Sequence, residues 1–197
     1  MSNNPLTPGR ATILPEQNRN APTVVNIEEV LDVGMISLRG SGKKAFADKI
    51  KMATGLTLPK VRKFTHDQDK RLLWMSPDEW LLICPYSDVA DYCTALEDEL
   101  GSQHSAITDV SDARVVLQIR GDGAREVLMK GSPIVLHTDQ FKPGDVRRTQ
   151  FNEISAAHIM IADKPPEFHL IAFRSYAQHI HDYLVAGAHP DAMVNLL

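Results

Sequence analysis

Apolar residues in the first half of the chain recur at the spacings of strands and helices. VGMISL (33–38) predicts a strand, and the segment 43–55 predicts a helix. RLLWM (71–75) and WLLIC (80–84), joined by the turn sequence SPDE, predict a hairpin, and the segment 87–101 predicts a second helix. The helical stripes consist of Phe46, Ile50 and Ala53, then Val89, Tyr92, Leu96 and Leu100.

The second half repeats this order of elements. ARVVLQI (113–119) predicts a strand and AREVLMKG (124–131) a short helix. AAHIMIA (156–162) and EFHLIAF (167–173) predict a hairpin, and SYAQHIHDYLVAG (175–187) predicts the last helix. A serine opens the final helix of each half and is its predicted N-cap; these are Ser87 and Ser175.

The halves also align residue by residue. LRGSG (38–42) matches IRGDG (119–123) with numbers that differ by 81, and WLLI (80–83) matches FHLI (168–171) with a difference of 88. The second half therefore carries a seven-residue insertion, in a middle loop around 141–145. We interpret the chain as a duplicated unit of strand, glycine turn, helix, hairpin and helix, with repeats at about 31–101 and 108–188.

Two such units predict a single α+β domain over residues 27–197, with mainly antiparallel sheets and helices packed on their faces. Neither unit can cover its own apolar surface, so we expect them to pair about a pseudo-two-fold axis. The predicted core consists of Trp74, Trp80, Leu82, Tyr92, Leu96, Leu117, Ile159, Phe168, Leu170, Ile180 and Leu184.

The first glycine turn precedes a lysine and could be read as a phosphate loop. Such a loop needs glycine where this chain has Ser37, and serine or threonine where it has Lys44. The second copy also replaces Lys43 with Ala124. We therefore predict that the shared glycines reverse the chain between strand and helix.

Residues 1–26 differ from the rest in composition, with four prolines, five asparagines and no aromatic residue. Such a segment buries too little apolar surface to offset its ordering entropy. We predict a flexible N-terminal arm, or else a segment that orders against a partner chain.

Composition and charge exclude several classes of function. The 197 residues carry a net charge of -4, which argues against binding to nucleic acid or anionic lipid. We expect no membrane insertion, because no apolar run approaches the ~20 residues that span a bilayer. The amino-terminal stretch lacks a secretory pattern, and two cysteines suit free thiols, so we expect a cytoplasmic location.

The histidines offer only weak evidence for a metal site. His179 and His181 are two residues apart on a predicted helix and point to different sides. His158 and His169 lie on neighbouring predicted strands and could meet, but no cysteine or carboxylate stands at ligand spacing. We expect hydrogen-bonded structural histidines and no metal site.

Other candidate reactive residues also lack partners in sequence. Ser111 has acidic neighbours but no nucleophile-elbow motif, and Cys84 and Cys93 fit core positions. Arg174 follows a predicted strand and could bind an anion or a partner's carboxylate, or else anchor the adjacent turn. We predict no catalytic, cofactor-binding or metal-binding residue in this chain.

Three blocks resemble a known family. MSPDEWLLICP (75–85), TDVSDARVVLQIRGDGAREVLMKGSPIVLHTDQFKPGD (108–145) and FRSYAQHIHDYL (173–184) are similar to the gamma subunit of bacterial heterotetrameric sarcosine oxidases. More distantly, the chain resembles the superfamily of the glycine-cleavage T-protein. The resemblance covers about 31–188 and leaves the arm outside.

The resemblance implies a fold like the folate-binding domain of aminomethyltransferases. It also implies alpha, beta and delta partner subunits in a complex that oxidatively demethylates sarcosine to glycine and forms hydrogen peroxide. The one-carbon unit becomes formaldehyde, or methylenetetrahydrofolate when tetrahydrofolate is present. In that family FAD, FMN, NAD and tetrahydrofolate belong to the alpha and beta subunits and zinc to delta, so this chain is expected to bind no cofactor.

Some positions depart from the family pattern. Ser132 stands where many members have cysteine, and Val135 stands where they have aspartate. These departures argue against a retained reactive residue. The alternative hypothesis is a free-standing folate- or one-carbon-binding module in which Arg120 or Arg174 holds the glutamate of folate.

Overall fold

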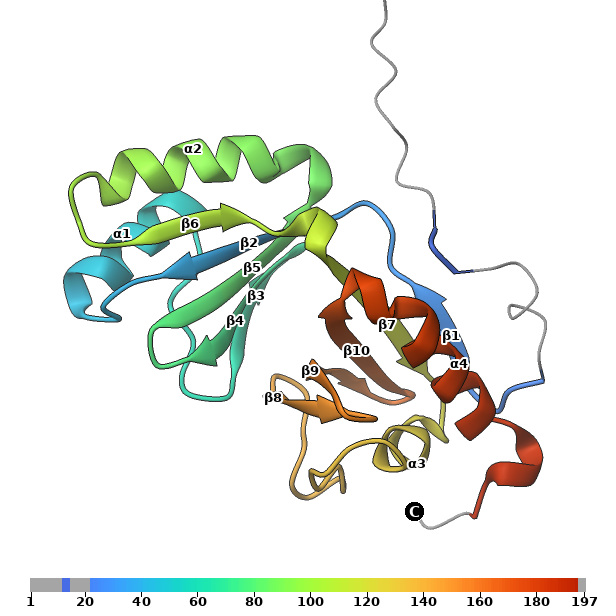
Figure 1. Cartoon of the computed structure of the whole chain (residues 1–197). Coiled ribbons are helices and arrows are strands. Elements are labelled where there is room, and N and C mark those ends of the chain that lie inside the picture. Colours follow the sequence, from blue (N-terminus) through green and yellow to red (C-terminus); the bar gives the residue numbers. More distant parts are fainter. Residues whose placement is uncertain (1–11, 15–21, 195–197) are drawn as a thin grey trace, which may run out of the picture.

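The computed structural model describes residues 12–14 and 22–194. Two five-stranded antiparallel sheets pack against each other, and helices cover the outer face of each sheet (Figure 1). The predicted α+β class and the duplication are confirmed by this architecture. Within the described residues, no helix is both long and apolar enough to cross a bilayer.

The first sheet has the strand order β3-β4-β5-β2-β6 and carries helices α1 and α2 on its outer face. Its elements are β2 (Val33–Arg39), α1 (Lys44–Thr54), β3 (Phe64–Asp67), β4 (Lys70–Ser76), β5 (Glu79–Pro85), the 3-10 turn η2 (Tyr86–Asp88), α2 (Val89–Leu100) and β6 (Ala106–Asp109).

The second sheet has the matching order β8-β9-β10-β7-β1 and carries α3 and α4. Its elements are β1 (Asn26–Glu29), β7 (Arg114–Arg120), α3 (Ala124–Met129), β8 (Val146–Phe151), β9 (Ile154–Asp163), β10 (Pro166–Phe173) and α4 (Ala177–Gly187). Three further 3-10 turns are η3 (Ser111–Ala113), η4 (Arg174–Tyr176) and η5 (Pro190–Ala192).

The edge strands β1 and β6 are exchanged between the halves (Figure 1). Strand β1 leads into the first half but pairs with β7 of the second, with Ile27 opposite Ile119. Strand β6 leads into the second half but pairs with β2 of the first, with Ile107 opposite Leu38. Each sheet is therefore completed by the segment that precedes the other half.

Both faces of each sheet are buried. In β5, Trp80 and Leu82 face the helices of their own half, whereas Leu81 and Ile83 face the second sheet. Side chains alternate between faces along a strand, so a continuous apolar run is needed where both faces are covered. The central contact between the sheets joins Met35, Leu73, Met75, Leu81 and Ile83 to Val116, Val146, Ala157, Ile159 and Ile171.

The repeated Arg-Gly pair has the same role in both copies. Arg39 lies opposite Glu79 across the strands, and Arg120 lies opposite Glu167. The closest nitrogen–oxygen distances in these ion pairs are 3.2 and 3.7 Å. Gly40 N donates to the carbonyl of Asp78, and Gly121 N donates to that of Pro166, so each glycine closes its strand against the adjacent hairpin.

Close packing at the first glycine turn also requires that residue 40 have no side chain. A Cβ on Gly40 would lie 2.2 Å from the ring of Phe46, which is buried in the core of α1 and α2. Gly42 has φ +63°, a backbone conformation that glycine adopts without strain. Chain reversal and close packing thus account for these glycines.

The structure corrects the predicted caps. Neither Ser87 nor Ser175 makes an N-cap hydrogen bond, because a 3-10 turn leads into each helix. The amide of Val89 already donates to the carbonyl of Tyr86, and that of Ala177 donates to the carbonyl of Arg174. The first helical amides are thus satisfied by the backbone.

The predicted core is largely confirmed. Nine of its eleven residues are buried, while Trp74 and Tyr92 are partly exposed. Four short strands were not predicted from the sequence: β1, β3, β6 and β8, all at sheet edges. Each has only four to six residues, and solvent on one side weakens the apolar alternation that reveals a strand.

The predicted arm lies mostly outside the described residues. Its described parts contact the second half: Leu14 and Val25 are buried against α4 and the second sheet's outer core. Thr23 Oγ1 donates to the carbonyl of Val25 just before β1. These contacts connect the described segment before β1 to the half that it completes.

We expect Gly40→Ala to lower the free energy of unfolding by about 1–3 kcal/mol, because the new methyl overpacks the Phe46 ring. Gly187→Ala at the end of α4 is the matched control, since its Cβ would meet only Lys130 at 3.5 Å. Urea unfolding measures both variants. Equal stability of the two variants would contradict the packing role of Gly40.

Candidate functional site

The histidines considered as metal ligands lie apart. The register sets His158 opposite Leu170 and His169 opposite Ile159, so the two rings occupy opposite faces of the second sheet. His158 and His169 therefore do not contact each other across the strands, although the sequence allowed it. Among the described residues, no group of three histidine, cysteine or acidic side chains is placed to hold a metal ion.

Ser111 has a structural role at the junction between the halves. The amide of Met35 donates to Ser111 Oγ at 2.9 Å, and the amide of Ser111 donates to Asp109 Oδ1 at 2.9 Å. The two cysteines are free thiols. Burial raises the pKa of Cys84 to about 12 and also raises the pKa of Cys93, so neither is a thiolate nucleophile at neutral pH.

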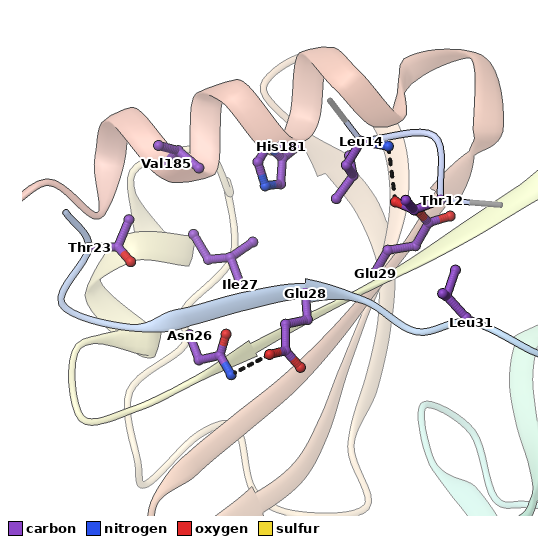
Figure 2. Close-up of a pocket in the computed structure, with 10 residues that line it drawn as sticks. All are labelled: Thr12, Leu14, Thr23, Asn26, Ile27, Glu28, Glu29, Leu31, His181 and Val185. Atoms are coloured by element: carbon purple, nitrogen blue, oxygen red, sulfur yellow. Dashed lines mark hydrogen bonds between the residues drawn. The ribbon is translucent and has the colours of Figure 1, made fainter. Parts of the chain in front are cut away.

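A pocket of about 370 Å³ is formed by β1, α4 and residues 12–14 (Figure 2). Arg174 lies beside this pocket, next to Glu29. In the pocket, the Glu29 carboxylate accepts hydrogen bonds from Thr12 Oγ1 at 2.6 Å and from Ile13 N at 3.0 Å. Arg174 Nη1 is 3.7 Å from Glu29 Oε1. Of the two roles that the sequence left open, this geometry supports anchoring, since Arg174 is paired within the chain.

The contact between Ser132 and His158 was not predicted from the sequence. Ser132 Oγ lies 2.7 Å from His158 Nε2. This contact joins β9 to the middle loop, which in the structure is the whole segment 130–145 between α3 and β8. Burial lowers the pKa of His158 to about 4, against the opposing effect of a backbone hydrogen bond at Arg147. Such an imidazole is a weak base, so the pair serves as a neutral hydrogen bond. The one sequence signal at this contact was that Ser132 stands where many family members have cysteine.

A second hollow, of about 520 Å³, lies between the β4–β5 hairpin, the middle loop and β8. We call it the hairpin cleft. Three arginines line it, Arg62, Arg147 and Arg148, with none of the lining residues acidic. Its remaining lining residues are Trp74, Met75, Ser76, Pro77, Ile134, Val135, Gln140 and Thr149.

Two buried carboxylates lie next to this cleft and hold two of its arginines, Arg147 and Arg148. Glu79 accepts from Arg148 Nη1 at 3.0 Å, and Asp145 lies 2.6 Å from Lys63 Nζ and 3.7 Å from Arg147 Nη1. Burial alone would raise the pKa of Asp145, but hydrogen bonds from Lys63 and from the Lys142 amide outweigh it and lower that pKa. Asp145 therefore acts as a fixed anion that orients Lys63 and Arg147, while Glu79 orients Arg148 through its hydrogen bond.

A protein-family model, described as the sarcosine oxidase gamma subunit family, matches residues 39–189. This chain belongs to that family. The match covers the Arg-Gly turns, both hairpins and the middle loop. The resemblance found in the sequence is thereby confirmed.

Curated relatives agree with this assignment. The sarcosine oxidase subunit gamma of Corynebacterium sp. strain U-96 is 31% identical over 119 residues, which cover 59% of this chain and 57% of the relative. The subunit of strain P-1 is 37% identical over 70 residues, which cover 36% of this chain and 34% of the relative. The matched region thus spans at most 57% of either relative.

Solved structures show the same fold. A chain of the heterotetrameric sarcosine oxidase from Corynebacterium sp. U-96, in complex with pyrrole 2-carboxylate, superposes with a TM-score of 0.81 at 24% identity, covering 92% of this chain and 93% of that one. The aminomethyltransferase T of the glycine cleavage system from Bartonella henselae has a TM-score of 0.62 at 12% identity, covering 86% and 47%. The expected aminomethyltransferase-like fold is confirmed.

The buried His158 and the largely buried His169 predict a loss of stability in mild acid. Burial lowers the pKa of His158 and of His169 to about 4, with the charge of Arg71 adding to the effect at His169. Because a histidine in an unfolded chain has a pKa of about 6.5, the stability from each neutral ring is complete above that pH. It falls as pH drops from about 6.5 to about 4, by an amount on the order of 3 kcal/mol per residue.

Urea unfolding at several pH values between 7 and 4 tests this expectation. His158→Leu removes one titrating ring, and we expect it to flatten the pH dependence relative to wild type. The exposed His104 provides a control, since His104→Gln should leave the wild-type curve unchanged. A His158→Leu curve parallel to wild type would refute the assignment.

Proposed function

We propose that this protein is a non-catalytic gamma subunit of a heterotetrameric sarcosine oxidase. In this proposal the complex oxidatively demethylates sarcosine to glycine and forms hydrogen peroxide. It releases the one-carbon unit as formaldehyde or transfers it to tetrahydrofolate. The supporting observation is the family match over residues 39–189, together with a fold that matches a chain of a heterotetrameric sarcosine oxidase along 92% of this chain.

The contacts of the candidate residues support an assembly role. Ser111 holds the backbone of Met35, and Arg174 pairs with Glu29. Ser132 and His158 bond to each other, and Cys84 is a buried thiol. Ser111, Arg174 and His158 thus each have a structural contact that accounts for their position.

The partners in this proposal are the alpha, beta and delta subunits. FAD, FMN, NAD and tetrahydrofolate are expected on the other subunits, and this chain is expected to bind none of them. The cytoplasmic location expected from the sequence is part of the same proposal.

The alternative, a free-standing folate-binding module, is not favoured. It rests on the aminomethyltransferase fold, and that likeness, at 12% identity, concerns the fold alone. Its two proposed folate-binding arginines are also engaged within the chain, Arg174 with Glu29 and Arg120 with Glu167.

Expression with and without the other subunits tests the proposed function. We expect the isolated full chain to show no flavin absorbance and no sarcosine-dependent peroxide formation. We also expect it to co-purify with the other three subunits as an active oxidase. Purified yellow chain that oxidises sarcosine by itself would rule the proposal out, and heat of binding on titration with tetrahydrofolate would favour the alternative.

A further inference from the structure

We propose that the hairpin cleft binds an acidic segment of a partner subunit that also inserts an apolar side chain. This inference rests on the proposed function, because it specifies where another subunit of the oxidase contacts this chain. At this cleft the middle loop is anchored, apolar residues are exposed beside it, and arginines line the surface.

The middle loop is held by a buried cation. The guanidinium of Arg125, in α3, donates to the carbonyls of Leu136 and Phe141, the latter at 3.0 Å, and to Asp163 at 2.7 Å. Arg125 is only 3% exposed, so these bonds are needed to offset the cost of burying its charge. The loop conformation is consequently fixed before any partner binds, which lowers the entropic cost of docking.

The anchored loop presents apolar side chains to solvent. Val135 is 64% exposed, although its neighbour Leu136 is buried and held by Arg125. Across the cleft, the partly exposed Trp74 and the exposed Pro77 belong to the β4–β5 hairpin. Aromatic and apolar side chains beside arginine are typical of the centres of protein interfaces.

The charge of the cleft selects an anionic occupant. Arg147 and Arg148 are oriented by the buried Asp145 and Glu79, while no ion pair of Arg62 is seen in the described part of the chain. This cationic lining is local, since the whole chain carries a net charge of -4. A partner carboxylate would complete the coordination of these guanidinium groups.

A protein segment fits the cleft better than a small ligand. Small-molecule sites bury most of their ligand, whereas Val135 on the wall of this cleft is largely in solvent. An extended segment can cover Val135 and Trp74 and reach the arginines together. Nucleic acid is disfavoured because the cationic area is small on an acidic protein.

Charge and polarity reversals on the cleft test the proposal. Arg62→Glu and Val135→Asp alter exposed side chains, so the fold should be unaffected. Lys44→Glu and Met52→Asp on α1 are matched controls, because both residues are exposed and lie outside the cleft. The Kd of each full-length variant is measured against the complex of the other subunits at low and high salt, and the free chains are compared by thermal unfolding.

We expect each cleft variant to weaken binding by about tenfold or more. We also expect the controls to bind as wild type, and added salt to weaken wild type more than Arg62→Glu. Wild-type affinity in both cleft variants overturns the proposal and leaves the proposed function intact. If Val135→Asp alters only self-association of the free chain, the occupant is a second copy and the proposal is also wrong. Failure of the wild-type chain to bind any partner refutes the proposed function itself.

Discussion

Burial of both faces of each sheet is the constraint on which the rest of this structure depends. The outer faces pack on helices and the inner faces pack on each other, so Leu81 and Leu82, although adjacent in β5, enter different cores. Buried faces leave little room for ionised groups, which need water or a partner. Buried carboxylates such as Glu79 and Asp145 accordingly lie at strand ends, where arginine or lysine can reach them.

This constraint also leaves loops and sheet edges as the places where side chains can contact other molecules. The chain differs most between its halves in the middle loop, where seven additional residues follow α3. Arg125 fixes that loop by hydrogen bonds to its backbone carbonyls. Ion pairs at the sheet edges fix Arg147 and Arg148 across the cleft. The fold thereby holds this loop in a fixed position, as rigid scaffolds commonly do for the loops that carry function.

The sequence predicted the inner strands, the main helices and the duplication because their apolar patterns are strong. It missed β1 and β6, although NIEEVLD (26–32) and AITDVSD (106–112) share isoleucine, valine and aspartate at matching positions. The contacts of the cleft could not be predicted, since they join Arg62, Trp74 and Arg148 from segments with no common spacing. The Ser132–His158 bond was missed for the same reason: register and loop path decide it.

The crossed pairing of β1 and β6 has a consequence for the ancestry of the fold. A single unit with the same pairing would lack its own edge strand and would have to borrow one from a second molecule. Its stable form would be a domain-swapped homodimer with true two-fold symmetry. Fusion of two gene copies would convert that intermolecular swap into the pairing now seen within one chain, and would leave one copy free to acquire a longer loop.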